Sequence, residues 1–180
     1  MTQAPFETGV LFILGGARSG KTRRALAAAE DLHARRGLAP VYIATAQAFD
    51  DEMRARIDAH KAERDAHWTT VEAPMDLPDA IAREASAERV LLVDCLTLWT
   101  SNLMLAEQDM AGPTAALIAA LDGAAGPVVV VSNEVGLSIV PENALARRFR
   151  DEAGWINQRV AAAADQVEFV AAGLPLRLKG

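Results

Sequence analysis

Residues 11–30 read LFILGGARSGKTRRALAAAE: a short apolar run, a glycine-rich loop, and then a segment with a helical pattern. Within it, residues 15–22 (GGARSGKT) fit the motif G-x-x-x-x-G-K-[ST] without a mismatch. Glycines let backbone amides turn toward phosphate oxygens, and the start of the following helix adds a partial positive charge. The stretch therefore predicts a buried strand, a phosphate-binding loop and a helix, in the order that this motif requires.

The motif assigns roles to individual side chains of the loop. Lys21 would reach the β- and γ-phosphates of a nucleotide, and the hydroxyl of Thr22 would bind Mg²⁺. Arg18 is a further candidate for phosphate contact. The alternative is an accidental glycine turn, which the strand before the loop and the helix after it make the weaker interpretation. The motif predicts binding of a nucleoside triphosphate and does not identify the reaction.

Apolar runs and helical segments alternate outward from this stretch along the whole chain. We expect strands at residues 10–14, 41–44, 68–72, 90–94, 128–132, 167–171 and 176–178. We expect helices at residues 21–35, 50 or 51 to 66, 79–86, 96–110, 114–121 and 144–164. Such alternation predicts an α/β fold with a mostly parallel central sheet and helices on both faces. No linker or repeat is visible, so residues 1–180 are expected to form a single domain.

Composition restricts the class of protein. The chain has 180 residues, 51% of them hydrophobic, and a formal net charge of -6. The acidic balance argues against general nucleic-acid binding, which normally needs a basic face. Cys95 is the only cysteine, which excludes an intramolecular disulfide and a cysteine-based zinc site. No apolar run is long enough to span a membrane, and residues 1–10 lack the features of a signal peptide, so we expect a cytoplasmic protein.

Two further stretches carry candidate chemistry. Residues 90–94 (VLLVD) are typical of a buried strand that ends in an acid. Asp94 could bind Mg²⁺ or could cap a helix. Because the chain also contains the phosphate-loop motif, we favour the metal-binding role for Asp94. Residues 50–68 (DDEMRARIDAHKAERDAHW) contain His60, whose neutral imidazole could attack the α-phosphorus of a nucleotide and release pyrophosphate. From spacing alone, the favoured interpretation of His60 is a core histidine on the face of Met53 and Ile57.

A resemblance distinguishes these alternatives. Six segments, in order, are GGARSGKT, YIATAQAFDDEM, RIDAHKAERDAHW, LLVDCLTLW, SNEVGLSIVPEN and ARRFRDEAGWINQRVAAAADQV. Together they resemble the bifunctional adenosylcobinamide kinase / adenosylcobinamide-phosphate guanylyltransferase family of cobalamin biosynthesis, from about Leu11 to Lys179. The phosphate loop is shared by many families, whereas the segments around H-K and N-E-V-G are far more particular. The resemblance implies a P-loop NTPase fold of the RecA-like kind.

The resemblance also implies two reactions and the residues that perform them. ATP or GTP, with Mg²⁺, phosphorylates adenosylcobinamide; GTP then guanylylates a histidine, here His60, and adenosylcobinamide phosphate takes the GMP to give adenosylcobinamide-GDP. His67 is better interpreted as a structural or positioning group. Lys21 serves catalysis beside His60, and Thr22 and Asp94 are the metal ligands. The implied nucleotide contacts are Gly15, Gly16, Ala17, Arg18, Ser19, Gly20, Lys21, Thr22, Ala44, Thr45, Ala46, Glu63, Arg64, Asp65, Ala66, Glu72 and Asp94.

Further expectations concern partners, alternative functions and two residues that follow a strand. The family resemblance implies a homotrimer, and we expect no nucleic acid and no membrane span. One alternative is a small-molecule kinase of the same fold that lacks the guanylyltransferase step. Another is a nucleotide-sensing regulator without catalysis, which the absence of an added recognition domain disfavours. For Asn133 and Glu134, which follow residues 128–132, contact with the bound corrinoid or nucleotide and capping of the loop are equally good interpretations.

Overall fold

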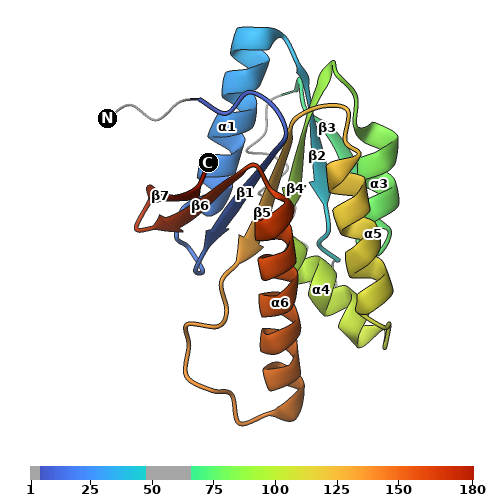
Figure 1. The fold of residues 1–180 in the computed structure, drawn as a ribbon, viewed down its shortest axis with the longest axis vertical. Helices are drawn as coiled ribbons and strands as arrows, with labels where there is room; N and C mark the ends of the chain where they lie inside the picture. The colour runs from blue at the N-terminus through green and yellow to red at the C-terminus, as the bar shows by residue number, and fades with distance from the viewer. Residues whose placement is uncertain (1–4, 48–65) are drawn as a thin grey trace.

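A computed structural model defines the fold and describes residues 5–47 and 66–180. The strands are β1 (Val10–Gly15), β2 (Ala39–Ala44), β3 (Thr69–Glu72), β4 (Arg89–Asp94), β5 (Val128–Asn133), β6 (Gln166–Ala171) and β7 (Leu174–Lys179). The helices are α1 (Lys21–Arg36), α3 (Leu77–Glu84), α4 (Leu96–Leu105), α5 (Ala111–Asp122) and α6 (Ala144–Ala163). Strands and helices alternate along the chain (Figure 1), as the sequence predicts.

The strands form one sheet in the order β3-β2-β4-β5-β1-β6-β7. Every pairing is parallel except that of β6 with β7, which is an antiparallel hairpin. The predicted mostly parallel sheet is therefore confirmed. Because parallel strands end at the same edge, the carboxyl ends of β1 to β5 come together, and this edge is where open α/β sheets bind ligands.

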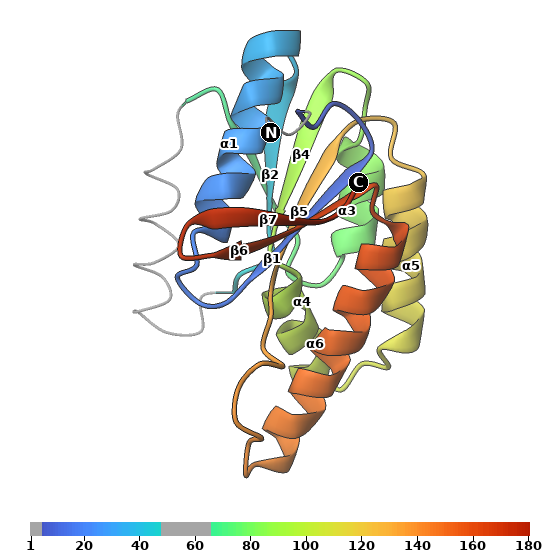
Figure 2. The same cartoon turned by 60° about the vertical axis from the view of Figure 1, so that its left-hand side comes forward.

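Helices cover both faces of the sheet, as predicted (Figure 2). Alternate residues of a strand point to opposite faces, so Leu11 and Ile13 of β1 pack with α1, whereas Phe12 packs with the helices opposite. On the α1 face the core includes Ala25, Ala29 and Leu32. The other face is covered by the buried sides of α3, α5 and α6. The central strands β1, β2, β4 and β5 carry apolar residues at consecutive positions because both of their faces are buried.

One predicted helix is too long. The sequence predicts a helix over residues 96–110, but α4 ends at Leu105. The reason is a reversal of the backbone: Glu107 has a φ of 55°, and the N–H of Gln108 donates to the carbonyl of Leu103. Helix α5 then starts at Ala111, ahead of Pro113, because proline is tolerated in a first turn, where its missing N–H is not needed.

Two predictions lie beyond what the structure tests. Most of the helix expected from residue 50 or 51 to residue 66 falls outside the described residues. The single domain over residues 1–180 also stays a prediction. In the described part of the chain, no helix is long and apolar enough to cross a membrane.

Candidate active site

The loop between β1 and α1 is tightly closed. A side chain at Gly15 would place its Cβ 2.5 Å from Ser19 Oγ and 2.6 Å from the carbonyl oxygen of Val170, so only glycine fits. Gly20 has a φ of 96°, in the left-handed region that favours glycine, and it directly precedes α1. These two glycines explain why the motif of residues 15–22 folds as a loop and not as a continuation of the strand.

The closed loop leaves donors available. Its Ser19 N–H donates to the carbonyl of Gly16 (3.2 Å), whereas the N–H groups of Ala17, Arg18 and Gly20 have no acceptor within the described residues. Lys21 is only 9% exposed, and its Nζ donates to the carbonyl of Gly16 at 3.0 Å. A lysine ammonium held on the loop's own carbonyl, together with three loop N–H groups that have no acceptor among the described residues, is a ready site for phosphate oxygens.

The hairpin of β6 and β7 supports the loop from outside. The turn between these strands contains Gly173, whose N–H donates to the carbonyl of Ser19 at 2.8 Å. A Cβ on Gly20 would lie 3.2 Å from the Cα of Gly173, so the two backbones are in close contact. Nothing in the local sequence around residue 173 signals this contact.

Five parallel strands end together beside the loop. Their last residues are Glu72, Ala44, Asp94, Asn133 and Gly15, in the order of the sheet. The register pairs Ala44 with Glu72 and with Asp94, and pairs Gly15 with Asn133. The structure therefore brings four predicted site residues to the edge that carries the phosphate loop. Asn133 joins them, although the sequence alone leaves its role open.

The predicted magnesium ligands fit that ion. Asp94 is half-buried, and its Oδ2 accepts a hydrogen bond from Tyr42 Oη at 2.8 Å, which fixes the carboxylate. Thr22 lies in the first turn of α1, next to Lys21. In the described parts of the chain, no three His, Cys, Asp or Glu side chains are grouped as a metal cage. Mg²⁺ suits such a site, because it is usually held by one or two protein oxygens together with water and substrate phosphates.

Thr45 is fully buried behind Asp94, and its side chain is committed to the protein. Its hydroxyl donates to the carbonyl of Cys95 and accepts from the N–H of Cys95, both at 2.8 Å. The amide of Asn102 donates to the carbonyls of Thr45 (2.8 Å) and Pro74 (2.9 Å). The N–H of Thr45 also donates, to the carbonyl of Asp94 at 3.2 Å, so both the side chain and the backbone of Thr45 are engaged within the protein, where they fix the end of β4. The nucleotide contact expected at Thr45 stays a prediction.

Replacing Thr45 with valine is expected to lower the free energy of unfolding by about 1–3 kcal/mol, because the buried N–H of Cys95 loses its acceptor. Urea unfolding measures the change. Thr69→Val, at an exposed position of β3, is the matched control and should leave stability within about 0.5 kcal/mol of the unmodified protein. Equal losses in the two variants would contradict the role of the Thr45 hydroxyl.

Cys95 does not add a nucleophile to the site. Burial, followed by the negative charge of Asp94, raises the pKa of its thiol to about 11. The thiol therefore stays protonated at neutral pH, and a thiol is a poor nucleophile compared with a thiolate. Cys95 instead packs in the core cluster that contains α1.

The remaining predicted residues do not all reach the loop. Because β3 runs parallel to β2, Ala66 precedes its amino end, on the edge of the sheet opposite Glu72 and the phosphate loop. The structure thus does not bring Ala66 together with the loop. His60, Glu63, Arg64 and Asp65 lie outside the described residues, and their roles stay predictions.

His67 lies in a cluster at the far end of α1. Its ring stacks on that of His33 with centroids 4.6 Å apart, and its Nε2 lies 3.1 Å from both carboxylate oxygens of Glu30. The indole N–H of Trp68 donates to the same carboxylate. These contacts tie the start of β3 to α1, which is a structural role of the kind expected for His67.

Comparisons with known proteins find relatives over nearly the whole chain. The family model described as "Cobinamide kinase / cobinamide phosphate guanyltransferase" matches residues 11–178. The chain is 52% identical, over 93% of its length and 96% of the relative's, to the bifunctional adenosylcobalamin biosynthesis protein CobP of Pseudomonas aeruginosa. It is 43% identical, over 94% and 99%, to the protein of the same description, CobU, from Salmonella typhimurium.

Solved structures of distant sequence share the fold. The flagellar accessory protein FlaH of Methanocaldococcus jannaschii matches 95% of this chain and 78% of its own, with a TM-score of 0.54 at 12% identity. A KaiC-like protein of Pyrococcus horikoshii matches 89% and 70%, with a TM-score of 0.54 at 15% identity. At these identities the likeness shows the fold alone, and it confirms the predicted RecA-like P-loop architecture.

Proposed function

The chain belongs to the cobinamide kinase / cobinamide phosphate guanyltransferase family, and on that premise we propose that its phosphate loop holds the triphosphate in both reactions and that His60 accepts the GMP in the second. The protein is a bifunctional enzyme of cobalamin biosynthesis, with cobinamide kinase and cobinamide-phosphate guanylyltransferase activity. The proposal concerns the residues that do this work, the adenosylated form of the substrate, the ion and the assembly.

In the kinase step, the hydroxyl of the aminopropanol arm of adenosylcobinamide attacks the γ-phosphorus of ATP or GTP. A new P–O bond forms, the bond from the γ-phosphorus to the bridging oxygen breaks, and the hydroxyl proton is released. Lys21 and the N–H groups of Ala17, Arg18 and Gly20 hold the phosphates and stabilise the charge that develops on them. Thr22 and Asp94 would hold Mg²⁺, which when bound offsets phosphate charge.

In the guanylyltransferase step, a ring nitrogen of His60 attacks the α-phosphorus of GTP. A P–N bond forms and pyrophosphate leaves, so GMP is held on the enzyme. A phosphate oxygen of adenosylcobinamide phosphate then attacks the same phosphorus, the P–N bond breaks, and adenosylcobinamide-GDP is released. The assignment to His60 is supported by its place in the segment RIDAHKAERDAHW and by membership of the family.

The proposed nucleotide site is supported mainly by the hydrogen-bond donors of the phosphate loop. Lys21 Nζ lies 3.0 Å from the carbonyl of Gly16, inside a loop whose amides at Ala17, Arg18 and Gly20 have no acceptor among the described residues.

A nucleotide that presents its γ-phosphorus to one acceptor and its α-phosphorus to His60 cannot use the same pose for both. Two binding modes, or a movement of the chain around His60, are therefore required.

Product analysis with adenosylcobinamide tests the proposal. The enzyme is incubated with adenosylcobinamide, Mg²⁺ and either ATP or GTP alone. The corrinoid products are then separated by chromatography and identified by mass spectrometry. We expect adenosylcobinamide phosphate in the kinase step and adenosylcobinamide-GDP only where GTP is present. If adenosylcobinamide phosphate is the sole corrinoid product with GTP, the alternative of a kinase without guanylyl transfer is supported. If adenosylcobinamide is not converted with either triphosphate, the alternative of a nucleotide-sensing regulator is supported.

We also propose a cytoplasmic homotrimer. Figure 1 shows that part of α6 and the chain leading into it project beyond the sheet. This region exposes large apolar side chains: Leu137 (81%), Ile139 (94%), Val140 (61%), Leu145 (52%) and Trp155 (58%). Exposed apolar patches of this kind mark interaction surfaces. Sedimentation equilibrium measures the mass of the assembly, and a monomer at micromolar concentration would contradict the proposal.

A further inference from the structure

Asn133 occupies a central place at the edge of the sheet. It is the last residue of β5, the strand that lies between β1 and β4. Its register partner in β1 is Gly15, where the phosphate loop begins, while Asp94 at the end of β4 pairs with Val131. Asn133 therefore lies between the loop that would hold the phosphates and the acid that would face the metal.

The side chain of Asn133 points to the same face as α1. Val129 and Val131 pack in the core cluster that contains α1, whereas Val130 packs in the cluster opposite. Ser132 continues this alternation, and its hydroxyl oxygen lies 3.3 Å from that of Thr97. Since successive side chains of a strand alternate between faces, Asn133 returns to the α1 face, where Lys21 begins the helix.

The backbone of Asn133 is held from three directions. Its N–H donates to Thr97 Oγ1 of α4 at 2.7 Å, and its carbonyl accepts from Asn157 Nδ2 of α6 at 3.2 Å. The next N–H, that of Glu134, donates to the carbonyl of Gly15 at 3.1 Å. Thr97 and Asn157 are themselves buried, so the end of β5 is rigidly placed.

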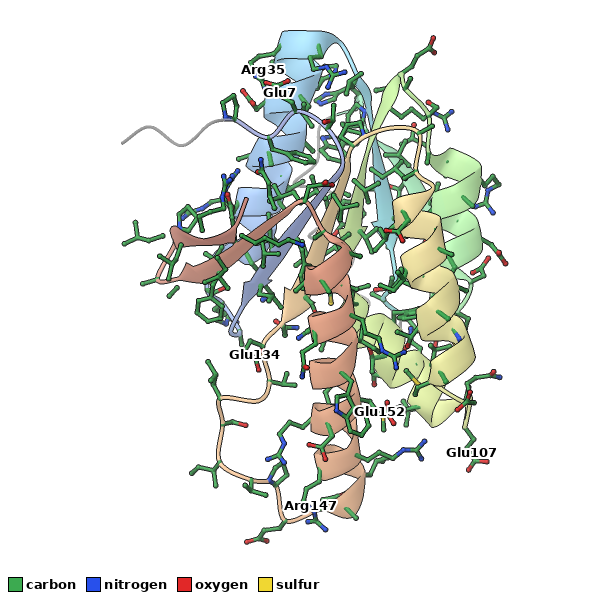
Figure 3. The ribbon with its side chains drawn as sticks, viewed as in Figure 1. Glu7, Arg35, Glu107, Glu134, Arg147 and Glu152 are labelled. Atoms are coloured by element: carbon green, nitrogen blue, oxygen red, sulfur yellow. The ribbon has the colours of Figure 1, made fainter. Side chains whose placement is uncertain are left out.

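The side-chain amide of Asn133 is free for a ligand. It is half-buried and has no hydrogen-bond partner within residues 5–47 and 66–180. Glu134, at the start of the chain that follows β5 (Figure 3), does not compete for this place. Its carboxylate accepts from the N–H of Gly136 at 2.6 Å and is turned into its own loop.

We propose that the carboxamide N–H of Asn133 donates to a γ-phosphate oxygen of the bound nucleoside triphosphate. The inference rests on the proposed binding of the triphosphate in the loop of residues 15–22. A neutral donor at a rigid position, on the face and edge that carry Lys21 and Asp94, suits the terminal phosphate. The residue would thus distinguish a triphosphate from a diphosphate, which lacks the group that Asn133 contacts.

The test compares two nucleotides on the full chain with Mg²⁺. Isothermal calorimetry measures the dissociation constants of GDP and of a non-hydrolysable GTP analogue with a β,γ-imido bridge. Asn133→Ala is expected to weaken binding of the analogue on the order of tenfold and to leave GDP within about twofold. Asn133→Asp is expected to weaken the analogue further, because a carboxylate would face the phosphate. The kinase KM for the triphosphate should rise in both variants.

Ser132→Ala is the matched control, because Ser132 neighbours Asn133 but its hydroxyl lies by Thr97 on the opposite face. It should leave both dissociation constants within about twofold, and circular dichroism confirms that each variant is folded. Equal weakening of GDP and the analogue in Asn133→Ala, or no weakening of either, would overturn the proposal. If the unmodified protein binds neither nucleotide, the proposed loop function itself fails, which is a different result from a selective Asn133 effect.

Discussion

Replacement of His60 with alanine is expected to abolish formation of adenosylcobinamide-GDP while phosphorylation of adenosylcobinamide continues. The imidazole is the proposed nucleophile of GMP transfer only, so its loss removes the covalent step and leaves the phosphate loop intact. Loss of a catalytic nucleophile lowers turnover by roughly 10³-fold or more. Kinase turnover should stay within about threefold of the unmodified enzyme, because γ-phosphoryl transfer needs no covalent intermediate.

Labelling of the protein with GTP that carries ³²P at the α-phosphorus measures the effect directly. The unmodified enzyme should acquire a label that is labile in acid and stable in alkali, as a phosphoramidate is, and His60→Ala should acquire none. His67→Ala is the control, because it removes a second imidazole of the same stretch that contacts Glu30 and His33. A His60→Ala enzyme that still makes adenosylcobinamide-GDP at an undiminished rate would exclude this histidine as the nucleophile.

Replacement of Lys21 with methionine is expected to impair both reactions together, by about 10²- to 10³-fold in kcat/KM for the triphosphate. The ammonium is buried in the loop, where it would move from the carbonyl of Gly16 to the phosphates, and methionine keeps the length without the charge. Removal of one preorganised charge contact in an enclosed site has effects of this size.

Steady-state kinetics of each reaction measures the Lys21 effect. Arg36→Met removes a cation from the other end of α1 and should change neither kcat/KM by more than about twofold. A loss of kinase activity alone in Lys21→Met would show that GMP transfer uses another nucleotide site. The pair of variants therefore distinguishes a shared triphosphate site from two separate ones.

Sequence reasoning succeeds where the determinant is local. The phosphate loop of residues 15–22 is specified by glycines at fixed spacing, and the strands are visible as apolar runs because both faces of the sheet are buried. Asp94 can be placed at a strand end for the same reason. Helix α4 is the exception: its apolar pattern continues past Leu105, while the left-handed turn at Glu107 has no obvious signal.

The rest depends on contacts between distant parts of the chain. The backbone of Asn133 is held in place by Thr97 and Asn157, which lie 36 and 24 residues away in sequence and contact it only in the folded protein. Likewise, the sequence places Ala66 and Glu72 close together, yet β3 separates them onto opposite edges. Strand order decides such neighbours, and a single sequence carries little information about strand order.

The hydrogen bond from the N–H of Gly173 to the carbonyl of Ser19 has a consequence for biosynthesis of the protein. The early-made loop is closed by a turn that the ribosome reaches roughly 150 residues later, a delay of roughly 8 to 30 seconds at ordinary translation speeds. Until that turn is made and β6 has paired with β1, a growing chain carries the complete motif without its finished support. Triphosphates in the cell would therefore be captured tightly only by a chain that has been translated past this hairpin.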